Sequence, residues 1–214
     1  QRSLKGHSEN SLAFYDDAIR QTLLEEQQLT EDMETALAEH QFQVWFQPQY
    51  DYDTGALIGT EALVRWLHPL KGLLTPAKFI PLFERNGFIS KLDAYVWEES
   101  CRWLQLWRQD ISKKDISVSV NVSRVDIYNT DLCAKLLHLI KKYNLDPSLL
   151  KLEITESAYM ENSSQLIKCV ERLHALGFSV EMDDFGSGFS SLNMLKAVPV
   201  DLLKLDMRFL EVGN

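Results

Sequence analysis

Oxygen- and nitrogen-bearing side chains recur near the ends of the predicted strands in this chain of 214 residues. Most are carboxylates, accompanied by one amide and one amine, and carboxylate and amide oxygens suit hard cations such as Mg²⁺, Mn²⁺ or Ca²⁺. Two such ions roughly 3.5 to 4 Å apart can activate a water and stabilise the leaving oxygen of a phosphodiester. The residues concerned are Glu61, Asn121, Glu153, Asp183, Asp184 and Lys204.

The adjacent pair Asp183-Asp184 is the sharpest feature of this set. At a strand end, one carboxylate can point into a barrel while the next reaches across its rim, so that two metals share Asp183. Lys204 could hold the attacking water or neutralise a phosphate oxygen. Two alternatives stay open, namely a set of buried interior salt bridges and, for Lys204, a surface lysine at a strand end. Several carboxylates facing one cavity would be destabilised without a metal, which disfavours the first alternative.

Hydrophobic patterns predict the elements that position these residues. Residues 42–50 and 57–66 form two antiparallel strands around the turn at 51–55, which ends in glycine. After them strands and helices alternate, and this order favours a parallel sheet with covering helices. We expect the later strands at 116–123, 150–156, 179–184 and 202–206, and helices at 76–85, 90–109, 129–142, 163–176 and 187–196. A tryptophan stripe in the second of these helices, Trp97, Trp103 and Trp107, is interpreted as core.

Two architectures fit this alternation, a doubly wound sheet and a barrel. In the strand at 116–123, Val118 and Val120 share one face while Ser119 and Asn121 share the other. A doubly wound sheet is buried by helices on both faces and would show near-continuous apolar runs. Half-polar strands instead indicate helices on one face and a barrel interior on the other. We therefore expect an α/β fold of the TIM-barrel type, in which catalytic residues lie at the C-terminal strand ends.

Composition limits the classes of partner and compartment. With 45% hydrophobic and 25% charged residues, the chain is typical of a globular domain, and its net charge of −9 argues against binding polymeric nucleic acid. The three cysteines have no paired spacing, which suits reduced thiols in the cytoplasm. No run approaches the roughly 20 apolar residues of a membrane span, so we expect no membrane contact by this domain. Residues 1–40 are interpreted as a helical connector, with one helix from Ser11 and a second from Thr30, an N-cap candidate.

The chain resembles the EAL domain family, named for its Glu-Ala-Leu motif, from about Glu39 to the C-terminus. The family hydrolyses cyclic di-GMP to linear pGpG and has a modified (β/α)8 barrel with an antiparallel first strand. The matching segments are Phe46-Gln47-Pro48, Glu61-Ala62-Leu63-Val64-Arg65-Trp66, Asn121-Val122-Ser123, Glu153-Ile154-Thr155-Glu156, Asp183-Asp184-Phe185-Gly186-Ser187-Gly188-Phe189-Ser190-Ser191-Leu192 and Lys204-Leu205-Asp206.

This resemblance implies a role for each matching residue. Lys204 would position the attacking water, Glu156 would hold the loop from Asp183 to Leu192, and Gln47 and Arg65 would contact the dinucleotide. The cofactors would be two Mg²⁺ or Mn²⁺ ions, with Ca²⁺ inhibitory, and the chain would form a homodimer. The first metal would be bound by Glu61, Asn121, Glu153 and Asp183, and Asp184 would help to bind the second.

Two functional classes follow from the resemblance. The first is a metal-dependent phosphodiesterase, in which Glu61 and Asp183 take part in catalysis beside Lys204 and Glu156. The second is a receptor or regulatory domain that binds cyclic di-GMP without turnover. The segment Phe14-Tyr15-Asp16 weakly resembles the connector that follows a diguanylate cyclase (GGDEF) domain, so the parent protein is expected to carry one upstream of the barrel domain at 41–214.

The strand count departs from the family pattern, because six strands are predicted where the family has eight. We expect a barrel that is truncated at its C-terminal end, with an exposed sheet edge. The chain should therefore be unstable as a monomer, or should complete its sheet by association. Sedimentation and thermal unfolding check this, and a monomer with a high, cooperative melting transition would contradict it.

Overall fold

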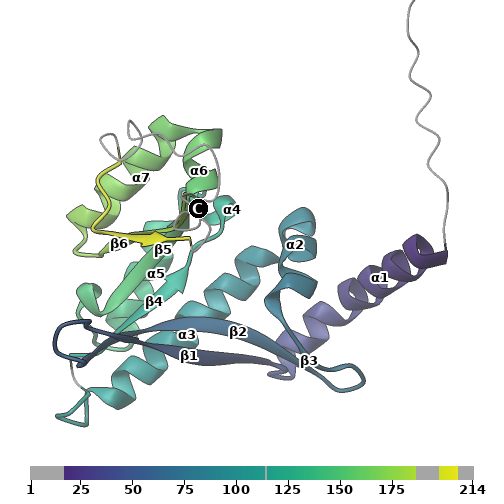
Figure 1. Cartoon of the computed structure of the whole chain (residues 1–214), viewed down its shortest axis with the longest axis horizontal. Coiled ribbons are helices and arrows are strands. Elements are labelled where there is room, and N and C mark those ends of the chain that lie inside the picture. The colour runs from purple at the N-terminus through teal and green to yellow at the C-terminus, as the bar shows by residue number, and fades with distance from the viewer. Residues whose placement is uncertain (1–16, 114, 187–197, 207–214) are drawn as a thin grey trace, which may run out of the picture.

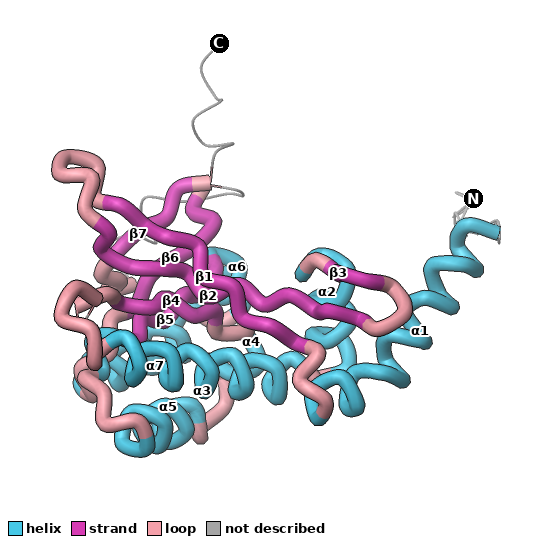
Figure 2. Tube along the Cα trace, turned by 90° about the horizontal axis from the view of Figure 1, so that it is seen from below, coloured by secondary structure: helices cyan, strands magenta, loops and turns pink. Residues whose placement is uncertain are grey.

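One mixed sheet with helices packed against it makes up the protein (Figures 1 and 2). The computed structural model describes residues 17–113, 115–186 and 198–206. The helices are α1 (Asp17–Ala38), α2 (Pro76–Asn86), α3 (Ile89–Trp107), α4 (Arg124–Ile127), α5 (Leu132–Lys142), α6 (Glu156–Glu161) and α7 (Ser163–Ala175), with a 3-10 turn at Pro147–Leu149. The strands are β1 (Phe42–Tyr50), β2 (Leu57–His68), β3 (Gly72–Leu74), β4 (Ser117–Asn121), β5 (Leu150–Thr155), β6 (Val180–Phe185) and β7 (Leu202–Leu205).

The strands follow the order β1-β2-β4-β5-β6-β7, and β3 pairs with β2 outside this path. β1 runs antiparallel to β2, and every pairing from β2 to β7 along the path is parallel. This confirms the predicted antiparallel first strand and the parallel remainder. The turn between β1 and β2 also forms as predicted, since the Asp51 carboxylate accepts hydrogen bonds from the backbone and hydroxyl of Thr54, and Gly55 has a φ of 66°.

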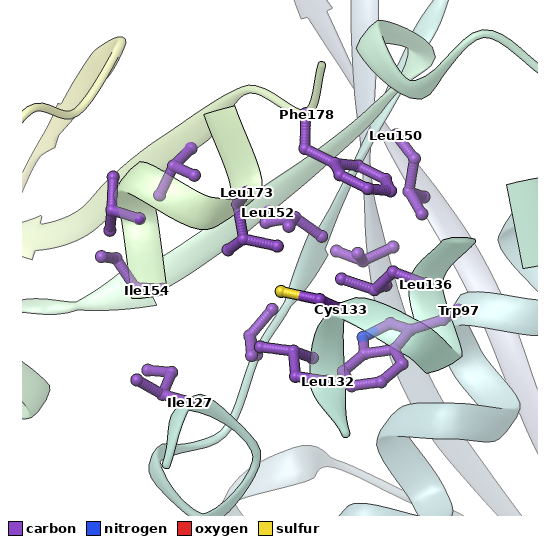
Figure 3. Close-up of a cluster of buried hydrophobic side chains, with 14 of the residues drawn as sticks. Trp97, Ile127, Leu132, Cys133, Leu136, Leu150, Leu152, Ile154, Leu173 and Phe178 are labelled. Atoms are coloured by element: carbon purple, nitrogen blue, oxygen red, sulfur yellow. The ribbon is translucent and has the colours of Figure 1, made fainter. Parts of the chain in front are cut away.

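Successive residues of each strand alternate between an apolar and a polar face of the sheet. On β5, Leu150, Leu152 and Ile154 are buried against Leu136 of α5 and Leu173 of α7 (Figure 3). Helices α3, α5 and α7 lie together below the sheet in Figure 2. Because successive side chains point to opposite faces, the residues between these leucines must face away from the helices. The apolar packing therefore fixes the direction of the polar residues that can do chemistry.

A second core cluster joins α1 and α2 to the other end of β2. Trp66 is fully buried, its ring packs against Phe42, Phe79 and Phe83, and its indole nitrogen donates to Gln41 Oε1 at 3.0 Å. Leu29 and Ala36 of α1 and Leu92 of α3 are buried in the same cluster. The C-terminal half of α1 is thus part of the folded domain, while its other end projects away from the sheet (Figure 1).

The helical region before β1 differs from its prediction. One helix, α1, covers the region where a new helix was expected at Thr30. The Thr30 hydroxyl donates to the Glu26 carbonyl one turn earlier, a bond that a threonine inside a helix can make, so this residue is not an N-cap. None of the described helices, α1 included, combines the length and apolar character needed to cross a bilayer.

Other predicted elements need smaller corrections. The strand β3 and the short helices α4 and α6 were not predicted. Of the tryptophan stripe, Trp97 is fully buried, but Trp103 is 36% exposed, so the interpretation as core was wrong for Trp103. The helix predicted at 187–196 lies outside the described residues.

Truncating Leu92 tests the second core cluster. Leu92→Ala should lower the free energy of unfolding by about 2 to 5 kcal/mol, because it removes a fully buried side chain and leaves a cavity. The matched control is Leu70→Ala, in the turn before β3, where the side chain is 91% exposed and the cost should stay within about 0.5 kcal/mol. Urea denaturation measures the free energy of unfolding of both variants. Equal losses in the two variants would contradict the assignment of Leu92 to the second core cluster.

Candidate active site

Three charged side chains from distant parts of the sequence meet on the polar face of the sheet. Lys204 Nζ of β7 lies 2.9 Å from Glu61 Oε2 of β2 and also contacts Glu153 Oε1 of β5. The side chain of Glu153 is fully buried, and those of Lys204 and Glu61 are largely so. The prediction that these three residues share one face of the sheet is confirmed, and Lys204 is not a surface lysine.

Burial shapes the electrostatics of this cluster. The pKa of Glu153 is raised to about 8, mainly by burial and also by the negative charges of Glu61 and Asp183, against the opposing effect of Lys204. For Lys204, burial acts to lower the pKa, but pairing with Glu153 and Glu61 outweighs it and the pKa is raised. Within the described atoms, Glu153 Oε2 is buried without a hydrogen-bond partner. The cluster therefore holds carboxylate oxygen that favours an additional cation.

Asn121 and Asp183 lie at the same edge as this cluster. Asn121 is opposite Glu153 across β4 and β5, and Asp183 is opposite Thr155 across β5 and β6. The backbone of Asn121 is held from the helix side, because the Trp97 indole nitrogen donates to its carbonyl at 3.0 Å. Both side chains thus come from strand ends beside Glu153, as predicted.

Asp184 and Glu156 shape the start of the loop after β6. Asp184 has a φ of 55°, in the left-handed region, and the pairing register between β6 and β7 is irregular from Met182 to Phe185. This local kink gives Asp184 a different direction from the regular strand, and such backbone strain is common at functional sites. Glu156 Oε2 accepts a hydrogen bond from the Gly186 backbone at 3.1 Å. The rest of the predicted loop, 187–192, lies outside the described residues.

The two residues predicted to bind the dinucleotide lie on β1 and β2. Gln47 is exposed and sits directly opposite Glu61 in the strand pairing. Arg65 shares the face of Glu61, and its guanidinium donates to the Val64 carbonyl and lies 5.6 Å from the centroid of Trp45. Both are therefore on the side of the sheet that carries the charged cluster.

Sequence reasoning missed a further charged network beside the cluster. Glu181 of β6 is almost fully buried, and its Oε2 accepts a hydrogen bond from Ser119 Oγ at 2.9 Å. Its Oε1 lies 3.1 Å from Lys151 Nζ, and its Oε2 lies 4.0 Å from Lys204 Nζ. The signal was present in the sequence, because Glu181 precedes Asp183 by two residues and so shares its face.

A pocket of about 500 Å³ opens beside Asn121. Its walls are mostly apolar and come from the middle of β2, from α2 and from α3, while its polar groups come from α2, from α3 and from the residues at and just after the ends of β4 and β5. Among its lining residues are Pro76, Ile80, Pro81, Asp93 and Arg124.

Asp93 joins this pocket to the end of β4, and sequence reasoning missed it too. Asp93 Oδ2 accepts a hydrogen bond from the Ser123 backbone at 3.0 Å. The Ser123 hydroxyl donates to Asp126 Oδ2 at 3.0 Å and caps the first turn of α4. Burial and the nearby charge of Asp126 together raise the pKa of Asp93 to about 8, against the opposing effect of the Ser123 hydrogen bond.

The sheet has parallel strands, with helices on one face and a cluster of carboxylates on the other. This arrangement defines a barrel-type domain with an acidic interior site. The sequence model of the EAL domain matches residues 30–213, so the chain belongs to the EAL domain family. The predicted fold, a modified TIM-type barrel with an antiparallel first strand, is confirmed.

Two relatives from Pseudomonas aeruginosa match nearly the whole chain. MucR, named as a bifunctional diguanylate cyclase/cyclic di-GMP phosphodiesterase, is 35% identical over 206 residues, which are 96% of this chain and 30% of that protein. NbdA, named as a cyclic di-GMP phosphodiesterase, is 36% identical over 206 residues, which are 96% of this chain and 26% of that protein. The chain thus spans less than a third of the length of these relatives.

Solved structures of similar fold include ligand complexes. The PaMucR phosphodiesterase in complex with c-di-GMP matches with a TM-score of 0.81 and 37% identity, covering 86% of this chain and 74% of that one. The EAL enzyme Bd1971, in a form with cAMP and cyclic di-GMP bound, matches with a TM-score of 0.79 and 27% identity, covering 92% of this chain and 53% of that one.

The buried Asp93 should make stability depend on pH. Because its pKa is raised on folding, the proton that it keeps stabilises the folded state below the unfolded pKa near 3.8, and this contribution is lost as pH rises through about 8. Asp93→Asn should remove this loss. Between pH 4 and 8, the free energy of unfolding of the wild type should therefore fall by on the order of a few kcal/mol relative to that of the variant.

Urea unfolding at several pH values measures the difference. The exposed turn residue Asp53 offers a matched control, since Asp53→Asn should give a pH profile parallel to that of the wild type. Parallel profiles for Asp93→Asn as well would contradict the assignment of a raised pKa to Asp93.

Proposed function

We propose that this chain is a metal-dependent phosphodiesterase that hydrolyses cyclic di-GMP to linear pGpG. The observation that carries the proposal is the meeting of Glu61, Glu153 and Lys204 at one edge of the sheet, beside an open pocket. The names of the relatives and the cyclic di-GMP complexes among similar structures support the choice of substrate.

The donor atoms of the cluster fit a hard divalent cation. They are carboxylate oxygens with an amide oxygen nearby, and Glu153 Oε2 is a buried oxygen that has no hydrogen-bond partner among the described residues. In the proposal Glu61, Asn121, Glu153 and Asp183 hold one ion and Asp184 helps to hold the second, as Mg²⁺ or Mn²⁺. When bound, such a pair supplies Lewis-acid chemistry that neutralises charge on a phosphodiester during hydrolysis.

The residues of the chain itself position the substrate and the water. The reaction adds one water across one phosphodiester, so that an oxygen–phosphorus bond forms, the bond to a ribose 3′ oxygen breaks, and that oxygen takes up a proton. The Lys204 ammonium has hydrogens to donate to the water or to a phosphate oxygen. In the proposal Gln47 and Arg65, which lie on the same side of the sheet, contact the ligand backbone.

The pocket suits a nucleobase. Pro76, Ile80 and Pro81 offer apolar walls for a flat ring, while Asp93 and Arg124 offer polar groups for its edges or for a phosphate. The pocket borders Asn121, so a base inside it would leave its phosphate near the charged cluster. A cyclic dinucleotide is thus compatible with both the pocket and the charged cluster.

A second candidate function is a receptor that binds cyclic di-GMP without turnover. Across residues 17–113, 115–186 and 198–206, no three acidic, histidine or cysteine side chains lie close enough together to hold a metal ion. The Lys204 ammonium contacts two of the proposed ligands, which favours a domain in which the amine balances the carboxylates. In that case the pocket with Gln47 and Arg65 would bind the ligand alone.

An assay of cyclic di-GMP turnover decides between the two. Chromatography should show linear pGpG with Mn²⁺ and none with EDTA or with Ca²⁺. Asp183→Asn should reduce turnover to background, because it removes a carboxylate charge from the proposed metal site, while the control Asp53→Asn in the exposed turn should leave turnover unchanged. Binding of cyclic di-GMP without product, with Asp183→Asn binding as tightly as the wild type, would establish the receptor instead.

A further inference from the structure

Lys204 lies near three carboxylates on the polar face of the sheet. Its ammonium contacts Glu61 Oε2 and Glu153 Oε1, and Glu181 Oε2 lies 4.0 Å from it. Glu181 already pairs with Lys151 and accepts a hydrogen bond from Ser119. The ammonium is thus in direct contact with Glu61 and Glu153 and beyond hydrogen-bond distance of Glu181.

The contacts with Glu61 and Glu153 conflict with metal binding. The oxygens that contact Lys204 belong to Glu61 and Glu153, the same residues that the proposed function assigns to a divalent cation. Even with the divalent cation on the free Glu153 Oε2, the two cations would share the same two carboxylates, and they would repel each other more strongly inside a protein than in water. We therefore expect the ammonium to move away from these carboxylates, yet its side chain is only 18% exposed, so leaving it unpaired would be costly.

Glu181 has the position and the capacity to accept it. Movement of about 1.2 Å from the present 4.0 Å would bring Lys204 Nζ within the 2.7–2.9 Å typical of a charge-assisted hydrogen bond to Glu181 Oε2. That oxygen accepts one hydrogen bond, from Ser119, and a carboxylate oxygen can accept two. Since Lys151 pairs with Oε1, the other oxygen, both lysines can be paired with Glu181 at once.

We propose that Glu181 is a positioning residue that receives the Lys204 ammonium when Glu61 and Glu153 bind a divalent cation. This inference rests on the proposed function, since it needs the metal site. Glu181 would keep Lys204 charged and directed toward the substrate while freeing the ligand oxygens. Because Lys151 pairs with Oε1 and Lys204 would pair with Oε2, Glu181 can receive Lys204 without losing Lys151, so the pair with Lys151 is not needed for metal binding.

Titration with Mn²⁺ tests this without turnover, because the electron paramagnetic resonance signal of free Mn²⁺ reports binding directly. Glu181→Gln keeps the shape of the side chain but removes its charge, and it should weaken Mn²⁺ binding about tenfold, the effect of losing one hydrogen bond between charged groups. Lys151→Met should leave Mn²⁺ binding as tight as in the wild type or tighter, because it keeps the Glu181 carboxylate that receives Lys204 and removes only a neighbouring positive charge.

The two variants separate positioning from a purely structural role. Both variants break the same ion pair between Lys151 and Glu181, so a structural role alone would weaken Mn²⁺ binding in both. That result would overturn the proposal. Unchanged Mn²⁺ binding in Glu181→Gln would overturn it as well. If Glu181→Gln does not fold by circular dichroism, the double variant Lys151→Met/Glu181→Gln, compared with Lys151→Met, gives the same test. A wild-type chain that binds no Mn²⁺ would overturn the proposed metal site and this inference with it.

Discussion

The balance between one buried ammonium and the carboxylates around it is the interaction on which the site depends. Lys204 crosses the polar face from β7 to reach β2 and β5, so its charge links strands that are not neighbours in the sheet. Without a positive charge there, Glu61 and Glu153 would repel each other in a poorly solvated space. The helices keep these charged side chains close together. Because the apolar side chains of each strand pack against the helices, the charged side chains must point to the opposite face of the sheet.

Much of the site could be predicted because strands have a period of two. Once Leu150, Leu152 and Ile154 are assigned to the helix side, Glu153 can face only the other way, and the same reasoning applies to Asn121 and Asp183. Glu181 obeys the same rule but belongs to no motif, and its partner Lys151 lies on another strand. Sequence patterns do not reveal such cross-strand pairing, so this network was missed.

The helical regions were harder to predict because local chemistry there permits more than one answer. The Thr30 hydroxyl can cap a new helix or bond to a carbonyl one turn back, and the sequence around it suits both. The packing of Leu29 and Ala36 against the aromatic cluster favours the continuous helix. In the same way, Asp93 sits in an ordinary amphipathic pattern on α3, and only the fold brings it to Ser123.

The division of each strand between two faces has a consequence for how such a domain changes over time. Substitutions on the face toward α3, α5 and α7 affect folding, whereas substitutions on the opposite face alter charge and ligand contacts while leaving the helix packing in place. Selection can therefore act on the two sets of positions almost independently. One scaffold can lose or regain an activity through a few exchanges on a single face, and a family built on it can contain both catalysts and sensors.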